Sequence, residues 1–430
     1  MKKPFKWDIY SDQPAQLKDK AFKKQMRSSQ KNSFIKMIFT ALCILPISLV
    51  AMPFVKKKEV KSEDFFSIGI DFQRNPVETN ELLKELESTN ILLRFKLWEM
   101  DSLTELKHFL EPHKEKKIIL KIMQDRENIE DLELLEKNLN QVFSQLNTIV
   151  DIFEIGTTIN RAKWGFFSID EYNSFYEVAF NLKKKSYSHI KLIGSGIIDF
   201  EYHFTAQTLF NFFKYKYDGI SSLLYVDRRG APENTQLGFT LSDKIAWLNT
   251  MIWLSPKVAQ KLYITEVNWP ITGTSPYAPT SEYECIDEEL YGDYMLRYYL
   301  LSLASQQVDS VSWHQLIAPG YGLIDNRKNI NKRSAFYTYK YMSQTLKYAQ
   351  FLRLDIKRDY YILQFLVNEQ LLQIHWSLKN TTLKNEDFFD VFDKNGKTMK
   401  EEILYIGSSP LYIYITKEVG RKINASERVK

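Results

Sequence analysis

The stretch KLYITEVNWP, residues 261–270, carries the residue in this chain best suited to chemistry. An apolar run of the kind buried in a sheet ends on the carboxylate of Glu266, followed by the amide of Asn268 and the indole of Trp269. Burying an unpaired carboxylate is costly, so a strand that ends on one usually presents it for chemistry. Glu266 is therefore the leading candidate for a catalytic group, with an ordinary rim ion pair as the structural alternative.

Other apolar runs also end on polar or aromatic residues. These ends carry Asp71, Arg94 and Glu99, Asp125, the stretch EIGTTIN (154–160), Asp199 and Glu201, Tyr225 and Asp227, and Trp313, His314 and Gln315. Several carboxylates beside flat aromatic faces suit a neutral, hydroxylated ligand such as a sugar better than a phosphate group. Taken alone, Tyr225 and Trp313 are as compatible with core packing as with ligand contact.

Eight short apolar runs would bring these residues together, and they alternate with amphipathic stretches of helical length. The runs span 65–72, 91–98, 117–123, 149–156, 190–196, 217–226, 261–269 and 309–316. Such alternation is typical of α/β proteins with crossover helices, and eight units predict a (β/α)8 TIM barrel over residues 65–345, with the working residues at the carboxyl ends of its strands. A doubly wound open sheet is the alternative, but the sequence has no glycine-rich loop after the first run to favour dinucleotide binding.

A different pattern begins near residue 346. The runs YYILQFLV, LLQIHWSL, DFFDVFD, EEILYIG and PLYIYIT alternate with a period of two, and DKNGK and GSSP supply turns. This pattern predicts a small all-β, sandwich-like domain over 346–418, followed by a tail over 419–430. Trp376 is expected in the core of that domain rather than on a sugar-binding surface.

The amino-terminal region predicts a membrane segment. Residues 37–55 carry no charge over the length that a bilayer-spanning helix needs. The tail over 1–36 carries more lysines and arginines than the linker over 56–64, which predicts a cytoplasmic tail and a single crossing of the cytoplasmic (inner) membrane. The barrel would then lie in the periplasm. The tail is expected to be a solvated or lipid-facing segment rather than a folded unit. A core helix or a signal peptide is the alternative, although the leader is long for a signal peptide.

Composition excludes several other classes. A formal net charge of +5 owes much to the amino-terminal tail, so no nucleic-acid partner is predicted. Cys43 and Cys285 lie far apart and lack the companions of a zinc site, and the six histidines show no metal-ligand spacing. We expect neither a metal nor a cofactor.

The strand-end residues resemble a known group. Arg94 at the end of the second run, TEVNWP at the seventh and Trp313 at the eighth look like clan A of the retaining glycoside hydrolases, nearest the β-xylosidase and α-L-iduronidase family. The likeness spans about residues 65–415. The stretches INRAKWGF, YVDRRGAPENTQ and APGYGLID further resemble a subgroup of glycosyl hydrolase-like proteins encoded with lipopolysaccharide-assembly genes.

The resemblance implies roles for individual residues. Glu266 would be the nucleophile that forms a glycosyl-enzyme intermediate, Arg94 would keep it ionised, and Tyr225 would hydrogen-bond to it. Trp313 would form part of the floor under the sugar ring. The remaining implied substrate-binding positions are Asn160, Asn268, Trp269 and Gln315. The substrate would be an oligosaccharide or glycolipid, reached from the membrane.

The sequence departs from the family where the fourth run ends. The family pattern there is F-E-x-x-N-E-P-N, whose second glutamate protonates the leaving oxygen, whereas this chain has FEIGTTIN with Thr157 and Thr158 at the Asn-Glu pair. A threonine hydroxyl is too weakly acidic to replace that glutamate. Glu154 lies ~13 Å further down the strand and is expected to be a buried structural carboxylate, paired with an arginine. Asp227 is the first candidate for a relocated acid, ahead of Asp199 and Glu201.

Three functional hypotheses follow from this departure. The first is a retaining glycosidase with a relocated acid. The second is a transglycosylase whose donor, such as a lipid-linked sugar phosphate, has a leaving group that needs no proton. The third is a non-catalytic saccharide-binding relative. The complete nucleophile strand, with its TEVNWP stretch, favours the first.

Overall fold

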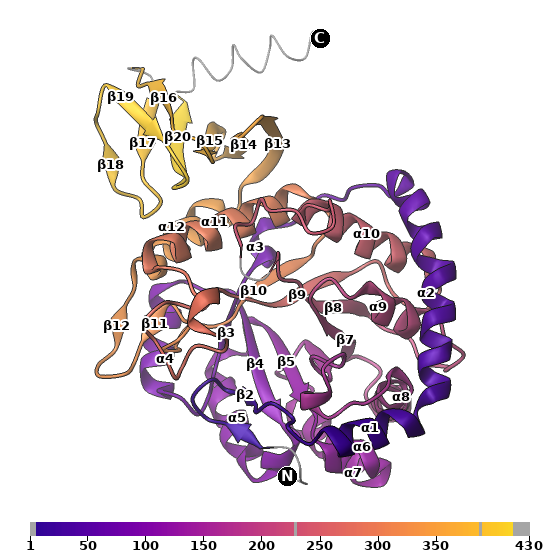
Figure 1. Cartoon of the computed structure of the whole chain (residues 1–430). Helices are drawn as coiled ribbons and strands as arrows, with labels where there is room; N and C mark the ends of the chain where they lie inside the picture. The colour runs from indigo at the N-terminus through magenta and orange to yellow at the C-terminus, as the bar shows by residue number, and fades with distance from the viewer. Residues whose placement is uncertain (1–5, 228–229, 387–388, 416–430) are drawn as a thin grey trace.

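Eight parallel strands close into a barrel in the computed structural model, which describes residues 6–227, 230–386 and 389–415 (Figure 1). Around the barrel the order is β10-β3-β4-β5-β6-β7-β8-β9, so sequential strands are neighbours and the last strand returns to the first. The strands are β3 (Phe66–Ile70), β4 (Asn90–Lys96), β5 (Lys117–Met123), β6 (Ile152–Ile155), β7 (Lys191–Ile198), β8 (Gly219–Leu223), β9 (Leu262–Val267) and β10 (Ser310–Trp313). The predicted TIM barrel is confirmed.

Strand alternation separates two buried layers. In β5, Ile118, Leu120 and Ile122 belong to the core between the strands and the outer helices, while Ile119 packs with Leu92 and Ile193 inside the barrel. Because side chains alternate along a strand, Lys121 shares the inward face with Ile119. A lysine therefore lies in the interior of the barrel.

Amphipathic helices cover the outside of the barrel. Their inward faces are buried, and polar caps start several of them: the Ser168 side chain accepts from Glu171 N in α8, and Thr240 and Asp243 form a capping box in α10. The helices are α3 (Ser62–Phe65), α4 (Pro76–Glu85), α5 (Leu103–Leu110), α6 (Arg126–Glu130), α7 (Leu132–Leu146), α8 (Ile169–Ser186), α9 (Tyr202–Leu209), α10 (Leu241–Leu254), α11 (Glu288–Ala304) and α12 (Ser334–Leu346). A short hairpin, β11 (Ile324–Asp325) and β12 (Asn331–Lys332), lies between β10 and α12.

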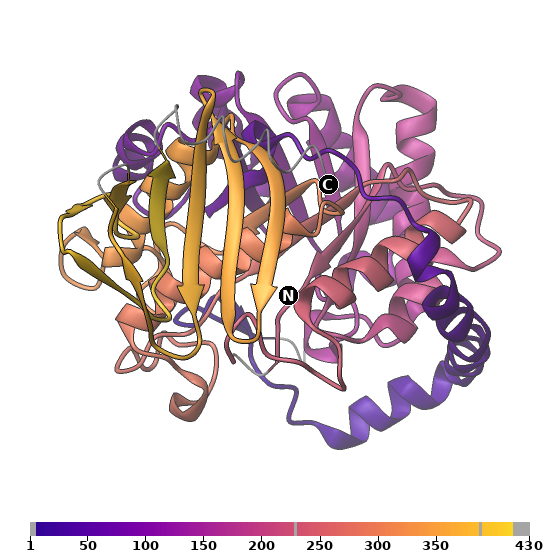
Figure 2. The ribbon, with the colours of Figure 1, turned by 90° about the horizontal axis from the view of Figure 1, so that it is seen from above.

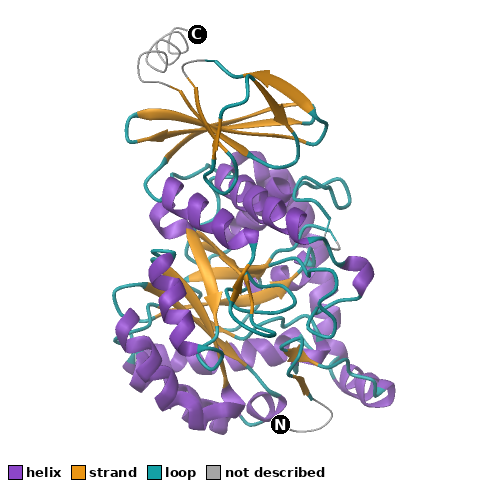
Figure 3. Cartoon of the chain, turned by 90° about the vertical axis from the view of Figure 1, so that its left-hand side faces the viewer, coloured by secondary structure: helices purple, strands orange, loops and turns teal. Residues whose placement is uncertain are grey.

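The carboxyl-terminal region is an antiparallel sheet of six strands with a separate two-stranded sheet, β16-β19 (Figure 2). The larger sheet has the order β13-β14-β15-β20-β17-β18 and lies over α11 and α12 (Figure 3). Trp376 is fully buried, with its ring 4.9 Å from that of Tyr361, so its predicted place in the core is confirmed. The strands are β13 (Gln350–Lys357), β14 (Tyr360–Val367), β15 (Gln370–Ser377), β16 (Thr381–Lys384), β17 (Phe389–Phe392), β18 (Thr398–Met399), β19 (Ile403–Ile406) and β20 (Leu411–Ile415). Residues 419–430 lie outside the described residues.

The segment before the barrel begins with an arm, residues 6–17, that contains β1 (Trp7–Asp8) and β2 (Gln13–Pro14). Helices α1 (Lys20–Ser29) and α2 (Lys31–Ala51) follow, and α2 stands along the flank of the barrel against α8, α9 and α10 (Figure 1). Residues Lys31–Phe54 form a helix long and apolar enough to cross a membrane. The prediction of a solvated tail needs correction for the arm, because Asp12 is buried among side chains of the barrel.

Candidate active site

A cavity of about 320 Å³ opens at the carboxyl ends of the barrel strands. Glu266 of β9 lines it together with Arg94 of β4, Tyr225 just after β8, and Asn268 and His314 just after β9 and β10. The strand-end positions singled out in the sequence as Glu266, Arg94, Tyr225 and Asn268 therefore meet around one space. This is the edge at which TIM-barrel enzymes build their active sites.

Glu266 is held as a carboxylate. Tyr225 Oη donates a hydrogen bond to Glu266 Oε1 at 3.1 Å, and Lys121 Nζ lies 3.6 Å from Glu266 Oε2. Burial alone would raise the pKa of Glu266, but the charges of His314, Lys121 and Arg94 and the Tyr225 hydrogen bond outweigh it and hold that pKa at about 2. Burial lowers the pKa of His314 itself to about 3, so Lys121 and Arg94 are the cations that act on Glu266 near neutral pH.

Lys121 is a site residue that the sequence reasoning missed. Its ammonium is fully buried between two carboxylates, 3.6 Å from Glu266 Oε2 and 3.6 Å from Glu154 Oε2. Glu154 is the buried carboxylate that was expected, but its cationic partner is this lysine and not an arginine. Thr265 Oγ1 also donates to Glu154 Oε1 at 2.9 Å. Burial raises the pKa of Glu154 despite the opposing charge of Lys121.

Arg94 has a different principal partner from the one expected. Its guanidinium forms an ion pair with the Asp12 carboxylate of the arm and donates to the Asp12 carbonyl oxygen at 3.3 Å. Arg74 adds a second ion pair to Asp12 at 3.9 Å. Burial would raise the pKa of Asp12, but Arg94 and Arg74 lower it, so Asp12 is a carboxylate and not a proton donor. Arg94 acts on Glu266 only as a neighbouring charge.

The arm forms one wall of the cavity through Ser11, Asp12, Gln13, Gln16 and Leu17. Gln13 Nε2 donates to the Pro279 carbonyl at 3.0 Å, and Lys163 Nζ donates to Gln13 Oε1 at 2.6 Å. Trp7 packs between Trp98 and Trp164, with ring centroids 5.4 and 6.0 Å away. These contacts place an amino-terminal segment at the mouth of the barrel.

The end of β6 lines the cavity with Thr158. Asn160 does not line the cavity. Its side-chain amide donates to Ile198 O at 2.9 Å and to Glu201 Oε2 at 2.7 Å, which ties the ends of β6 and β7 together. Arg161, which does line the cavity, pairs with Asp199 at 2.6 Å and Glu201 at 2.7 Å. Both acids are therefore engaged with a rim arginine.

Trp313 and Trp269 lie beneath the site and not in it. Both side chains are buried, their rings stack at 5.7 Å, and Trp313 Nε1 donates to Tyr291 Oη at 2.7 Å. The expectation that Trp313 forms the sugar-facing floor is corrected, because His314 lines the cavity instead. Gln315 is also buried, and its amide donates to Ile317 O at 3.1 Å.

Asp227 stands apart from Glu266 in the described part of the chain. It lies just after β8, where Asn234 Nδ2 donates to its two carboxylate oxygens at 3.3 and 3.4 Å, but it is not among the residues that line the cavity. Lys163, on the loop after β6, does line it, and burial together with Arg161 lowers the pKa of Lys163. Among the described lining residues the only carboxylates are Asp12 and Glu266.

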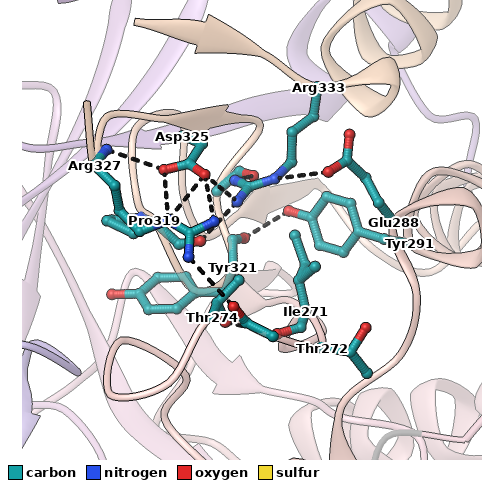
Figure 4. A network of polar contacts seen from close by, with 12 residues as sticks. Ile271, Thr272, Thr274, Glu288, Tyr291, Pro319, Tyr321, Asp325, Arg327 and Arg333 are labelled. Atoms are coloured by element: carbon teal, nitrogen blue, oxygen red, sulfur yellow. Dashed lines mark hydrogen bonds and ion pairs between the residues drawn. The ribbon is translucent and has the colours of Figure 1, made fainter. Parts of the chain in front are cut away.

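The loop after β10 is fixed by a polar network that presents Tyr321 to the cavity (Figure 4). Arg333 donates to Pro319 O at 2.7 Å, and Tyr291 Oη donates to Tyr321 O at 2.6 Å. The Tyr321 ring then stacks on His314, with centroids 5.4 Å apart. A flat aromatic face therefore borders the cavity close to Glu266. Among described residues, no group of three or more His, Cys, Asp or Glu side chains is placed to hold a metal ion.

Solved structures similar to this chain include glycoside hydrolases. A family 39 glycoside hydrolase from the gut symbiont Bacteroides cellulosilyticus WH2 matches 84% of this chain and 82% of its own, with a TM-score of 0.62 and 13% identity. A GH30 endoxylanase from Clostridium papyrosolvens C71 matches 84% and 97% (TM-score 0.55, 8% identity), and a GH39 β-xylosidase from Caulobacter crescentus matches 84% and 98% (TM-score 0.53, 11% identity). No protein-family model and no curated protein matches the sequence. The fold is thus that of the TIM-barrel glycoside hydrolases, which confirms the predicted resemblance at the level of fold.

Proposed function

We propose that the protein is a membrane-attached glycoside hydrolase that cleaves O-glycosidic bonds of a cell-surface saccharide by a retaining mechanism, with Glu266 as nucleophile. The observation that carries this proposal is a single ionised carboxylate at the end of β9, aimed into a cavity at the active edge of a glycosidase-type barrel. A lipopolysaccharide precursor is the substrate that the resemblance of INRAKWGF and its companion stretches suggests.

In the proposed reaction, each step would be carried out by a side chain of this protein. Glu266 would attack the anomeric carbon, the glycosidic oxygen would leave with a proton, and water would then hydrolyse the glycosyl ester and retain the configuration. Lys121 keeps the carboxylate ionised before attack, and Tyr225 orients one of its oxygens. Arg94, Asn268 and Tyr321 border the space that the sugar would occupy.

The leaving oxygen needs a proton donor, and two residues compete for that role. Asp227 is the donor predicted from sequence, and it would have to approach the cavity from the end of β8. Lys163 already lines the cavity from the loop after β6, the strand end that carries the acid in related glycosidases. The lowered pKa of its ammonium brings it closer to the range useful for proton transfer.

The second candidate function is glycosyl transfer from a donor whose leaving group needs no proton, such as a lipid-linked sugar phosphate. The observation that favours it is Thr158, a hydroxyl at the position of the usual acid. A non-catalytic saccharide-binding protein is the third candidate. Attachment to a membrane through α2 suits both a glycolipid donor and a surface saccharide as substrate. The periplasmic location of the barrel and the single membrane crossing remain predictions from the sequence.

Leaving-group dependence separates these candidates. Aryl glycosides with good and poor leaving groups are offered to the full-length protein and to Glu266→Ala, Asp227→Ala and Lys163→Met. A hydrolase with a relocated acid predicts that one of the two donor variants loses activity mainly on the poor leaving groups, while Glu266→Ala loses activity on all of them. Turnover confined to activated donors, unchanged in both donor variants, favours the transferase. Saccharide binding without turnover of any donor would contradict an enzymatic role.

A further inference from the structure

Helix α2 packs on the barrel through specific polar contacts. Trp247 Nε1 of α10 donates to Ser48 Oγ at 2.7 Å, and Gln207 Nε2 of α9 donates to Ser33 O at 3.2 Å. Lys36 pairs with Asp170 of α8 at 2.9 Å. Ser33 and Ser48 are buried, and Ile44, Leu45, Leu49 and Met52 pack against the barrel core. One face of α2 therefore packs against the barrel along the whole length of the helix.

The opposite face of α2 is apolar and uncovered. Six of its large apolar side chains are more than half exposed: Ile35, Ile38, Phe39, Leu42, Ile47 and Val50. The helix therefore buries the hydroxyls of Ser33 and Ser48 against the protein and leaves large apolar side chains exposed on its outer face, where a helix that faces water carries polar residues. An uncovered apolar stripe of this kind marks a surface that docks on another apolar phase.

The two ends of α2 are anchored at opposite ends of the barrel. Before α2, the arm is hydrogen-bonded into the cavity mouth. After it, Lys58 N donates to Gln306 O at 3.0 Å and Lys58 pairs with Asp309, just before β10. If α2 crossed a bilayer, about 30 Å of hydrocarbon would separate its two ends and the arm would lie on the far side from the barrel. The observed arm contacts are incompatible with that arrangement.

Charge identifies the surface that covers the stripe. Helix α1, which precedes α2, has the exposed cations Lys20, Lys24 and Arg27 and no acidic residue. Basic groups beside an apolar helix face match the headgroups and acyl region of an anionic bilayer. Trp253 near the end of α10 and Phe212 just after α9 are also exposed, and both α9 and α10 pack against α2.

We propose that α2 lies along the surface of an anionic lipid bilayer with its outward stripe embedded, so that the arm and the barrel remain on the same side of the membrane. Attachment is then monotopic and replaces the single-pass arrangement predicted from the sequence, and the barrel mouth, with its arm, stays beside the lipid surface. This inference goes beyond the proposed function, and its tests do not require activity.

The first test measures whether the arm stays docked in the membrane-bound full chain. Tyr10 and Tyr277 lie edge to face, with ring centroids 5.6 Å apart. In a background of Cys43→Ser and Cys285→Ser, Tyr10→Cys and Tyr277→Cys are treated in native membranes with a short bifunctional maleimide. A cross-linked species that forms within one chain is expected.

Lys18→Cys and Tyr348→Cys, labelled singly with an impermeant maleimide, are expected to react from the same membrane face. Labelling from opposite faces, without the cross-link, would overturn the proposal.

The second test addresses the lipid contact. Leu42→Glu and Phe39→Glu place charges in the stripe, and Val77→Glu places the same charge at an exposed apolar residue of α4 as a control. Binding to vesicles of phosphatidylglycerol and phosphatidylcholine is expected to fall at least tenfold for the two stripe variants and to stay unchanged for the control. Equal binding by all three, or no vesicle binding by the unaltered protein, would refute lipid as the occupant. Self-association through the stripe, detected by sedimentation without lipid, would refute it as well.

Discussion

Replacing Lys121 with methionine perturbs the centre of the site while conserving volume and burial. Lys121 Nζ lies 3.6 Å from an oxygen of each of Glu154 and Glu266. At an effective dielectric constant near 20, each contact is worth about 4 kcal/mol, which corresponds to about 3 pKa units. Lys121→Met is therefore expected to raise the pKa of Glu266 from about 2 to about 5.

The effect on stability has a definite pH dependence. In the unaltered protein the depressed pKa of Glu266 contributes stability that is present above the unfolded-state value of about 4.3 and is lost as the pH falls toward 2. In Lys121→Met the folded pKa lies above the unfolded one, so that contribution changes sign. The part of the difference in free energy of unfolding that is linked to Glu266 is expected to be about 4 kcal/mol at pH 7 and to shrink toward pH 4.

Denaturant unfolding of the single variants Lys121→Met and Glu266→Gln and of the double variant gives the coupling energy directly. Glu154→Gln in the same cycle reports the second carboxylate. A coupling below about 1 kcal/mol, the size of a solvent-exposed ion pair, would refute the reasoning. A destabilisation that does not vary between pH 4 and pH 7 would refute it too, because no carboxylate would then be responding to the lost ammonium.

Three further variants test other parts of the site. Asp12→Asn removes the carboxylate that pairs with Arg94, so the arm is expected to loosen and become cleavable by protease, and saccharide binding is expected to strengthen. An arm that stays as resistant to protease as in the unaltered protein would contradict its ionic anchoring. Thr158→Glu restores a carboxylic acid at the end of β6 and should raise hydrolysis of poor leaving groups by a factor on the order of 10² or more, if the enzyme is a hydrolase; no change would argue for transfer. Trp313→Ala should cost about 3–5 kcal/mol in unfolding free energy because the ring is fully buried against Trp269, and a cost under 1 kcal/mol would contradict its place in the core.

The barrel could be predicted because local patterns and global fold agree. The run 117–123 coincides with β5, and the other seven barrel strands overlap their predicted runs. Glu266 could be predicted as well, since a carboxylate at the end of a buried strand has few structural uses. Lys121 carried an equally readable signal: a lysine on the inward face of an apolar strand needs a buried carboxylate partner, and Glu154 and Glu266 were both available.

Two features depend on contacts that no local pattern encodes. His314 and not Trp313 lines the cavity, in a region where the register between β9 and β10 shifts between Val311 and Trp313. A bulge of this kind changes which side chains share a face of the strand, and no residue of the run DSVSWHQL predicts a bulge there. Asp12 reaches Arg94 across 82 residues of sequence, so its role emerges only from the tertiary structure. Charge counting treated its segment as a solvated tail for that reason.

The most direct test of the account is whether Glu266 becomes covalently attached to a sugar. The full-length protein is incubated with 2-deoxy-2-fluoro glycosides that carry activated leaving groups, and its peptic peptides are examined by mass spectrometry. A single glycosyl ester is expected on the peptide that contains TEVNWP, absent from Glu266→Gln and formed without help from Thr158. A glycosyl adduct on another residue would contradict the role of Glu266 as nucleophile. Turnover with inversion of configuration and no adduct would contradict it as well.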